Sequence, residues 1–580
     1  MKVRDYEWWI IGALGIIAFF LAMIGFNIMY TEAGVQRNLF DLAFQSMKIF
    51  GMEFVDGFSS PLPWQLEVAR WLAPGVILYT AVKAIMYFIR REFKSFQLSY
   101  KKDRIIVTSL NEKSRHLIKD FLNNGEKVIV IAGIKDVRKL DEVEKEGAVI
   151  VEGDITSKKF LNNIAAHKAK HFVFLEDDDE TNISNAISVY NYLIKYGKDK
   201  KQTIFTHVAD DIKLDELMEL KFFEKYLEKN EANKNCEIRV FSMNERSSRV
   251  LFNAFSPDEF KTVRPDSPQL RVAIFGSGKL SQSMIIRFAR IGHYANHSKI
   301  KITLFHEGDF LVKKLLQNFP KITDLIEFES IDNPIDLFDI EEFNKLQHEQ
   351  PFDAVYLLCE NDSLSSNILK KLIKNDAKGN INVVLALLNP DGILSKWYNV
   401  KTIGNISLHK FNLIEESFTI QSVISEKIDE MAKLIHAFYL PPKEERNPEK
   451  GSHKEWEYLA IDFKNQNREQ ADHLDVKVRA LGCKIVPLDS PEEEFIIDEK
   501  AEIFEILAET EHNRWIGHMT LSGWKKGKKR DENNKIHPDL IPYHKLSEDV
   551  KQYDRETILN IPVLLEKQGK KIVKRDEKEF

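Results

Sequence analysis

The sequence is poor in cysteine. Only Cys236, Cys359 and Cys483 are present, and none stands in a CxxC pair or at metal-ligand spacing from a histidine. This pattern excludes a disulfide scaffold, argues against a structural zinc site and fits a reducing compartment. The net charge is also small, −6 over 580 residues, so the composition gives no reason to expect nucleic-acid binding.

Charged residues are absent or sparse in two long stretches near the N-terminus. Trp8–Thr31 carries none and is followed by no secretory cleavage pattern, and Trp64–Ile89 is close to the length that a bilayer-spanning helix needs. Positive residues flank the outer ends of both stretches, which by the positive-inside rule places both termini in the cytoplasm. We expect residues 1–102 to be a two-span domain in contact with membrane lipid, in a cell inner membrane.

The loop between the spans has apolar residues at helical spacing over Asn38–Phe50. Span, short helix, loop and span is a layout that resembles two-span potassium channels, but the filter sequence TVGYG is missing, so a potassium-selective pore is not expected. Glu53 and Lys83 are the candidates for lining a pore. Two alternatives stay open: the short helix packs the spans together without a pore, and Lys83 snorkels to the inner interface.

The second span also holds Glu67 and Arg70, three residues apart, which we expect to form a local ion pair. After it, residues 95–102 form a short connector before the strand-like run that begins at Arg104. A joint this short predicts that movement of the soluble part pulls directly on the membrane helix.

From Arg104 onward, apolar β-branched runs alternate with helical patterns, which predicts parallel sheets with helices on both faces, an α/β fold. The pattern restarts near Leu270, so we expect two tandem Rossmann-like domains, residues 103–268 and 269–419. The predicted strands are Ile105–Val107, Val128–Ile131, Ala148–Val151, His171–Leu175, Val272–Phe275, Lys301–Phe305, Ile326–Phe328 and Ala354–Leu358.

Two motifs in the first domain, Gly153-Asp154-Ile155-Thr156 and the run Phe174–Asn182, resemble the GDAT and DDxxN signatures of TrkA-type (RCK-like) domains. The run Tyr356–Asn367 repeats the second motif in the second domain. The resemblance covers roughly residues 104–411. It implies a ligand-sensing module that is often oligomeric and is coupled to a membrane pore.

A dinucleotide needs glycines at the first strand–helix turn, where backbone N–H groups approach a pyrophosphate. The first domain has no glycine in Thr108–Ser114, so binding there is not expected. The second domain reads GSGKLS in the right context. The candidate residues for NAD or another nucleotide are Gly276, Ser277, Gly278, Lys279 and Ser281, with Glu307 as a possible ribose partner. The alternative is a tight turn kept for packing; the cofactor itself is not identified.

Residues 420–580 are predicted to be mainly α-helical, and four motifs in order, Glu511–Trp515, Ser522–Gly527, His537–Tyr543 and Gln552–Arg555, resemble the ryanodine-receptor (RyR) repeat. The resemblance implies ligand or partner binding rather than chemistry. Aromatic faces and cationic donors suit an aromatic, phosphate-bearing ligand; the candidates are His512, Arg514, Trp515, Trp524, Arg530 and Tyr543. The alternative is that the tryptophans form the core of a small domain. His512 and His537 have no third metal ligand.

Together these features predict a ligand-gated membrane channel or channel regulator that works as a homo-oligomer, a dimer or tetramer, and senses a nucleotide-like small molecule. No catalytic constellation or metal site is expected. A role as a stress or antiviral defence effector is a hypothesis. The alternative function is a membrane-anchored nucleotide sensor or scaffold without a pore.

Overall fold

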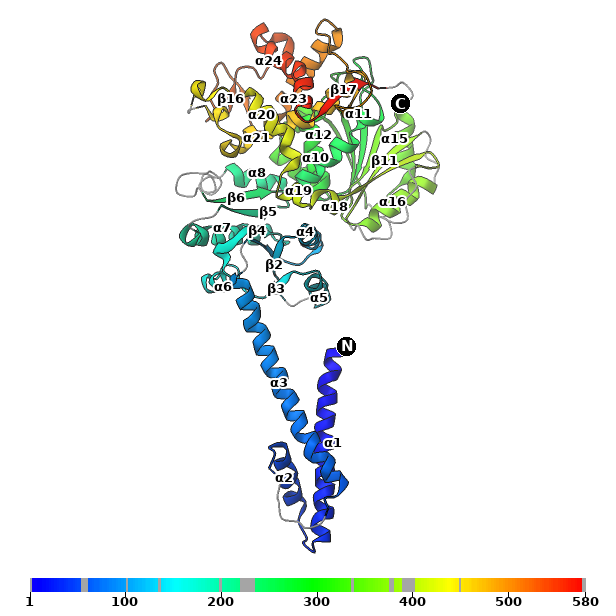
Figure 1. Cartoon of the computed structure of the whole chain (residues 1–580). Coiled ribbons are helices and arrows are strands. Elements are labelled where there is room, and N and C mark those ends of the chain that lie inside the picture. The colour runs from blue at the N-terminus through cyan, green and yellow to red at the C-terminus, as the bar shows by residue number, and fades with distance from the viewer. Residues whose placement is uncertain are drawn as a thin grey trace. The chain divides into compact units, whose positions relative to one another are not determined.

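A computed structural model describes residues 3–53, 61–100, 103–133, 137–197, 201–219, 235–334, 338–374, 380–388, 402–447 and 450–575. The chain divides into two compact units, Met1–Lys101 and Lys102–Phe580 (Figure 1).

The N-terminal unit is a helical hairpin with a short third helix: α1 (Val3–Glu32), α2 (Leu39–Phe50) and α3 (Trp64–Tyr100). Small residues, Ala18, Ala22, Ala69 and Ala73, are buried between α1 and α3. At Gly25 the helices approach so closely that an added Cβ would lie 2.7 Å from the Leu66 Cβ. Small residues are what allow such close helix packing in a membrane.

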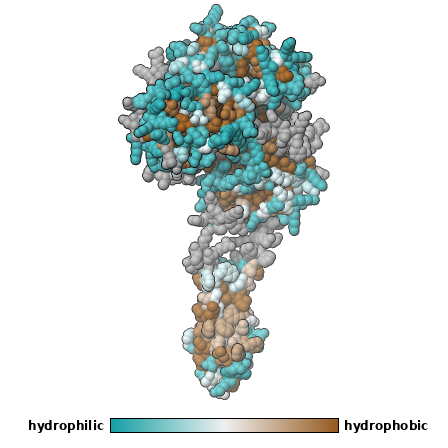
Figure 2. Space-filling view, turned by 180° about the vertical axis from the view of Figure 1, so that it is seen from behind, coloured by the Kyte–Doolittle hydropathy of each residue, from teal (hydrophilic) through white to brown (hydrophobic). Residues whose placement is uncertain are grey.

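By length and composition, two stretches of this unit could cross a membrane, Trp8–Glu32 and Trp64–Ile85. Figure 2 shows apolar side chains over much of the surface of the helical unit. The predicted helix between the spans is confirmed as α2, which Asn38 caps by accepting a hydrogen bond from the Asp41 N–H, 2.8 Å away. α2 buries Leu42 and Ile49, whereas Phe40, Phe44 and Met47 are exposed.

Several charged groups in this unit have partners close in the sequence. The predicted Glu67–Arg70 pair is confirmed, at 3.2 Å. Glu53 pairs with Lys48 at 3.6 Å, and the Lys83 ammonium lies 5.4 Å from the centre of the Tyr79 ring. These contacts do not decide between a pore and the alternatives, so the roles of Glu53 and Lys83 stay predictions.

The predicted connector is wrong for most of its length, because α3 continues to Tyr100. The sequence from Arg90 to Tyr100 contains no proline or glycine to end a helix. Residues 101–102 lie outside the described residues. The helix therefore ends only a few residues before the first strand, which begins at Arg104.

The first sheet of the soluble unit has the strand order β3-β2-β1-β4-β5-β6, and every neighbouring pair is parallel. Its elements are β1 (Arg104–Thr108), α4 (Glu112–Asn123), β2 (Lys127–Ile131), α5 (Val137–Lys145), β3 (Val149–Val151), α6 (Lys158–Asn163), β4 (Ala169–Phe174), α7 (Asp179–Tyr196), β5 (Gln202–His207), α8 (Asp211–Glu219) and β6 (Cys236–Phe241).

Two helices, α10 (Met243–Phe255) and α11 (Pro257–Phe260), lead into the second sheet, whose order is β12-β13-β11-β10-β7-β8-β9. Its elements are β7 (Arg271–Phe275), α12 (Lys279–Ile291), β8 (Lys301–His306), α13 (Phe310–Asn318), α14 (Ile322–Leu325), β9 (Glu327–Asp332), α15 (Ile340–Glu349), β10 (Ala354–Leu357), α16 (Asp362–Lys374), β11 (Ile381–Leu387), β12 (Thr402–Ile403), β13 (Ile406–Asn412), α18 (Leu413–Ser417) and α19 (Ile420–Val423).

Apart from the short antiparallel strand β12, the second sheet repeats the order of the first. This is the order of doubly wound dinucleotide-binding folds, in which the strand order reverses between the first and fourth strands. The predicted α/β class with two tandem Rossmann-like domains is confirmed.

The C-terminal part is mainly helical, as predicted, and packs on the second sheet domain through α23 and α12 (Figure 1). Its main elements are η4 (Lys427–Asp429), α20 (Glu430–Tyr439), α21 (Ile461–Asp472), α22 (Leu474–Ala480), β14 (Cys483–Pro487), α23 (Glu502–Leu521), β15 (Lys525–Lys526), β16 (Ile536–His537), α24 (Glu548–Leu559), α25 (Ile561–Glu566) and β17 (Lys570–Lys574). β14 and β17 form an antiparallel pair.

Candidate functional site

The glycine turn after β7 lies at the reversal point of the second sheet, between β7 and β10. Gly276 has φ +140°, and an added Cβ would lie only 2.4 Å from the backbone oxygen of Leu358. On the other side, the Gly276 N–H donates to Phe305 O at 3.0 Å. A side chain does not fit here, so packing alone is enough to require this glycine.

Gly278 is the N-cap residue of α12, and no side chain caps the helix there. The first backbone N–H groups of α12 are thus left to water or to a ligand, which is the arrangement that binds phosphate in this fold. Ser277 and Glu307 meet beside the turn, where the Glu307 N–H donates to Ser277 Oγ at 2.9 Å. Ser281 is buried, with Oγ 3.4 Å from Leu358 O, so it serves packing.

A carboxylate lies against this turn. A Cβ added to Gly278 would lie 3.3 Å from Oε1 of Glu360, an exposed side chain that follows β10. A bound phosphate would be repelled by Glu360 in this position. Because the side chain is exposed and flexible, it is free to rotate away when an anion binds.

Lysines from both sheet domains converge near the start of α12, and the sequence pointed to only one of them. Lys279 is the first residue of α12, and Lys113 lies in the first turn of α4. Burial lowers the pKa of Lys113, the nearby Asp177 raises it, and the Lys279 ammonium lowers it further. The two ammonium groups are therefore close enough to repel each other. Their proximity depends on how the domains pack, so no local sequence signal predicts it.

The turn of the first domain is closed by its own side chains. Ser109 replaces the first glycine and takes a left-handed φ of +70°. Asn111 caps α4 in a reciprocal capping box with Ser114, and its Nδ2 donates to Leu175 O at 2.7 Å. With the helix N–H groups capped by side chains, this turn lacks the open site that a pyrophosphate needs.

The TrkA-type signature residues of the first domain hold loops together. Asp178 caps α7 by accepting a hydrogen bond from Thr181 N–H at 2.8 Å. The buried Asn182 donates to the backbone oxygens of Glu176 at 2.9 Å and His207 at 3.1 Å, tying the ends of β4 and β5 together. These contacts give the motif a structural role in this chain.

The residues predicted to bind ligand in the C-terminal part do not share one surface. His512 is buried, with Nε2 2.8 Å from Ile541 O and Nδ1 3.3 Å from the Asp554 carboxylate. Trp524 and Tyr543 are buried too, and the Tyr543 hydroxyl donates to Glu505 at 3.0 Å. His512, Trp524 and Tyr543 are therefore part of the interior of this domain and do not line a ligand pocket.

Arg514 is buried in an ionic cluster. It contacts Glu511 at 2.7 Å, and Glu511 in turn contacts the buried Lys477 at 2.6 Å. Burial alone would lower the pKa of Arg514, but the carboxylates of Glu511, Glu469 and Asp554 together outweigh burial and raise it. A ligand could reach this guanidinium only by displacing the cluster.

Trp515 and Arg530 are the accessible members of the predicted set. Trp515 is half-buried, stacks on His512 at 5.5 Å between ring centres and meets the His537 ring edge-on at 5.0 Å. Arg530 is exposed and lies 3.0 Å from Glu532. Burial lowers the pKa of His537, and the positive charge of Arg530 lowers it further. The exposed lysines of β15 and the loop after it are Lys525, Lys526, Lys528 and Lys529.

His518, which the sequence did not single out, lies in the same buried cluster. Its Nδ1 is 2.9 Å from Glu469, and its Nε2 is 3.1 Å from Asp462. Burial by itself lowers the pKa of His518, but these two carboxylates outweigh it and raise the pKa to about 9. The imidazole is therefore charged at neutral pH and pairs α23 with α21. Neighbouring charges are Arg290 of α12 and Arg514 of α23 itself, both of which contact Glu469.

We predict that this pairing weakens at alkaline pH. A pKa raised from 6.5 to about 9 gives stability that is complete below pH 6.5 and lost as the pH rises through 9. The free energy of local opening of α23 should fall by on the order of 3 kcal/mol across this window. Hydrogen exchange of the α23 amides, expressed as protection factors, measures it. His518→Gln should remove this pH dependence, whereas the control His544→Gln, at an exposed position, should keep it. If the opening free energy of α23 depends on pH equally in both variants, the dependence does not come from His518.

Within the described residues, no group of three or more His, Cys, Asp and Glu side chains could hold a metal ion. The three cysteines are buried, without disulfides, and burial raises the pKa of the Cys359 thiol to about 11. They are therefore poor nucleophiles at neutral pH.

Two ranges match known protein families. Residues 105–220 match the TrkA-N domain, and residues 492–574 match the RyR domain. The TrkA-type and RyR resemblances are thereby confirmed. The matched TrkA-N range is the first sheet domain, whose turn is closed, whereas the open glycine turn lies in the second.

A comparison with curated proteins finds no match. Among solved structures, the chain is similar to the GsuK channel. For the structure of GsuK bound to ADP, the identity is 11% and the TM-score 0.37, and the match covers 74% of this chain and 98% of that chain. The NAD-bound channel has 9% identity and a TM-score of 0.36 and covers 74% and 85%. The GsuK RCK domain has 9% identity and a TM-score of 0.35 and covers 57% and 78%.

Proposed function

We propose that this chain is a subunit of an oligomeric membrane channel or channel regulator that responds to a nucleotide-like ligand, binding it without catalysing its turnover. The observation that carries the proposal is the uncapped start of α12 behind a glycine turn, with Lys279 and Lys113 beside it. Backbone N–H groups, a helix N-terminus and two ammonium groups are complementary to a pyrophosphate.

The path to the membrane is short. α3 ends at Tyr100, and β1 begins at Arg104, a buried residue whose guanidinium donates to the backbone oxygens of Ile164 and Ala165 at 2.9 Å. β1 is therefore firmly held in the first sheet domain, and a shift of that domain would move the end of α3. A ligand does this only if it prefers one of the two states.

We predict that a dinucleotide such as NAD, or ADP as the smaller probe, binds the full chain and that Lys279→Met and Lys113→Met each weaken binding about tenfold. The matched control is Lys119→Met, an exposed lysine on α4 that is distant from its first turn. Calorimetry in detergent measures the affinities. Equal affinities in all three variants would place the ligand elsewhere, and binding lost only in Arg530→Ala would place it at the RyR domain.

Ion flux separates this proposal from its alternative. Chains reconstituted in liposomes should conduct ions in a manner that depends on the nucleotide identified by calorimetry. Nucleotide binding without flux would favour a membrane-anchored sensor or scaffold. The cytoplasmic orientation of both termini, the dimeric or tetrameric state and a role in stress or antiviral defence stay predictions.

A further inference from the structure

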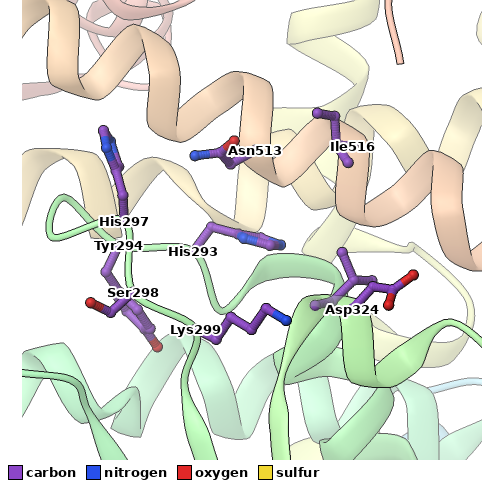
Figure 3. A pocket seen from close by; sticks show the side chains of 9 residues that line it. His293, Tyr294, His297, Ser298, Lys299, Asp324, Asn513 and Ile516 are labelled. Atoms are coloured by element: carbon purple, nitrogen blue, oxygen red, sulfur yellow. The ribbon is translucent and has the colours of Figure 1, made fainter. Parts of the chain in front are cut away.

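A cavity of about 200 Å³ lies where α23 meets the second sheet domain (Figure 3). Its walls are the loop after α12, helix α14 and one face of α23. The loop follows the C-terminal end of α12, whereas the glycine turn precedes the N-terminal end, so the cavity is a different site.

Two contacts on either side of the cavity hold α23 against the loop. His297, with a left-handed φ of +50°, places Nε2 3.1 Å from Ile506 O and 3.3 Å from Thr510 Oγ1. Further along α23, Gly517 approaches so closely that an added Cβ would lie 2.6 Å from His293 Nε2. Asn513, between these contacts, faces the cavity (Figure 3). The cavity therefore lies between two fixed contacts of α23 with the loop after α12.

The lining carries one formal charge of each sign. Lys299 donates to Thr323 O at 3.1 Å, which leaves two of its N–H groups for a ligand. Asp324 supplies a carboxylate, and Asn513 offers both a donor and an acceptor. The structure gives no ion pair between Lys299 and Asp324, both of which lie among the described residues. Burial lowers the pKa of His293 to about 4, so this imidazole adds no charge at neutral pH.

From these groups we propose that the cavity binds a small zwitterion of amino-acid size, with its carboxylate toward Lys299 and its ammonium toward Asp324. A ligand with one charge would pair with only one of these two groups, whereas a zwitterion pairs with both. A cavity of about 200 Å³ is large enough for an amino acid.

Such a ligand would touch α23 through Asn513 and the second sheet domain through Lys299 and Asp324. It would therefore favour the arrangement in which the RyR domain is docked, and undocking would weaken its binding by the same factor. This inference does not depend on nucleotide binding at the glycine turn.

The test uses the full chain in detergent after dialysis. The standard amino acids are screened by thermal shift and their affinities measured by calorimetry, with acetate and ethylamine as probes of one charge each. We expect at least one amino acid to bind, and both single-charge probes to bind at least about tenfold more weakly. An amino acid retained through dialysis and released on denaturation counts as binding.

Lys299→Met and Asp324→Asn should each weaken that binding at least about tenfold, and Lys321→Met, an exposed lysine outside the lining, should not. Both changed residues are exposed, so folding should be preserved. The absence of amino-acid binding to the unchanged chain would overturn the proposal. Equal affinities in Lys299→Met and Lys321→Met, or equally tight binding of acetate, would also overturn it.

Discussion

Replacing Asp472 with alanine should loosen the C-terminal helices from both sheet domains, at a cost of about 3–5 kcal/mol in local opening free energy. Asp472, at the end of α21, lies 2.8 Å from Arg249 of α10 and 3.2 Å from Arg287 of α12. All three side chains are at most 5% exposed. Alanine would leave the two buried guanidinium groups with only Asp429 and Glu245 as carboxylate partners among the described residues. A buried charge that loses a partner costs far more than a lost surface pair.

Hydrogen exchange of the full chain measures this cost, because it reports opening segment by segment in a protein too large for two-state unfolding. Protection should fall in α10, α12 and α21 together. Asp472→Asn keeps the size and one acceptor, so it separates the loss of charge from the loss of packing. The control is Glu532→Ala, which breaks an exposed pair with Arg530 and should cost less than about 1 kcal/mol. Protection unchanged in Asp472→Ala would show that Asp429, 2.7 Å from Arg249, is sufficient by itself.

The strands predicted from the sequence are runs in which apolar residues dominate, since a strand buried on both faces reads as a nearly continuous apolar run. β5 (Gln202–His207) was not among them. It is buried along its whole length yet contains Gln202, Thr203, Thr206 and His207. Its polar groups find tertiary partners, as when Gln202 Nε2 donates to Ala169 O at 2.9 Å. A pattern of apolar residues cannot anticipate such partners.

The candidate site also has features that local sequence predicts and features that depend on tertiary packing. The glycine turn and the missing glycines of the first domain are local features, so the sequence identified both. Lys113 belongs to the other sheet domain, and Glu360 follows a different strand, β10, so neither is local to the turn. Likewise, Glu511 meets the buried Lys477 only once α22 and α23 have packed together. Donors and aromatic rings in the RyR range suggested a pocket, but His512, Arg514 and Tyr543 contact carboxylates or a backbone oxygen in the interior.

The sharpest test of the glycine turn compares two alanine substitutions two residues apart. Gly276→Ala should destabilise the second sheet domain by about 2–5 kcal/mol. The new Cβ would meet a backbone oxygen, Leu358 O, at 2.4 Å, and alanine is strained at φ +140°. Neither the oxygen nor the turn can move without disturbing β7 or β10. Hydrogen exchange of these two strands measures the loss.

Gly278→Ala should leave the fold intact but weaken nucleotide binding about tenfold or more. Its φ of −84° and ψ of 177° suit alanine, and the new Cβ would lie 3.0 Å from the flexible Glu360 side chain. The methyl group would, however, occupy the space through which a pyrophosphate reaches the N–H groups of α12. Calorimetry with NAD or ADP, alongside exchange of β7 and β10, gives both readouts on the same sample. Binding that survives Gly278→Ala, while Gly276→Ala disrupts the fold, would mean that the turn is kept for packing and the ligand binds elsewhere.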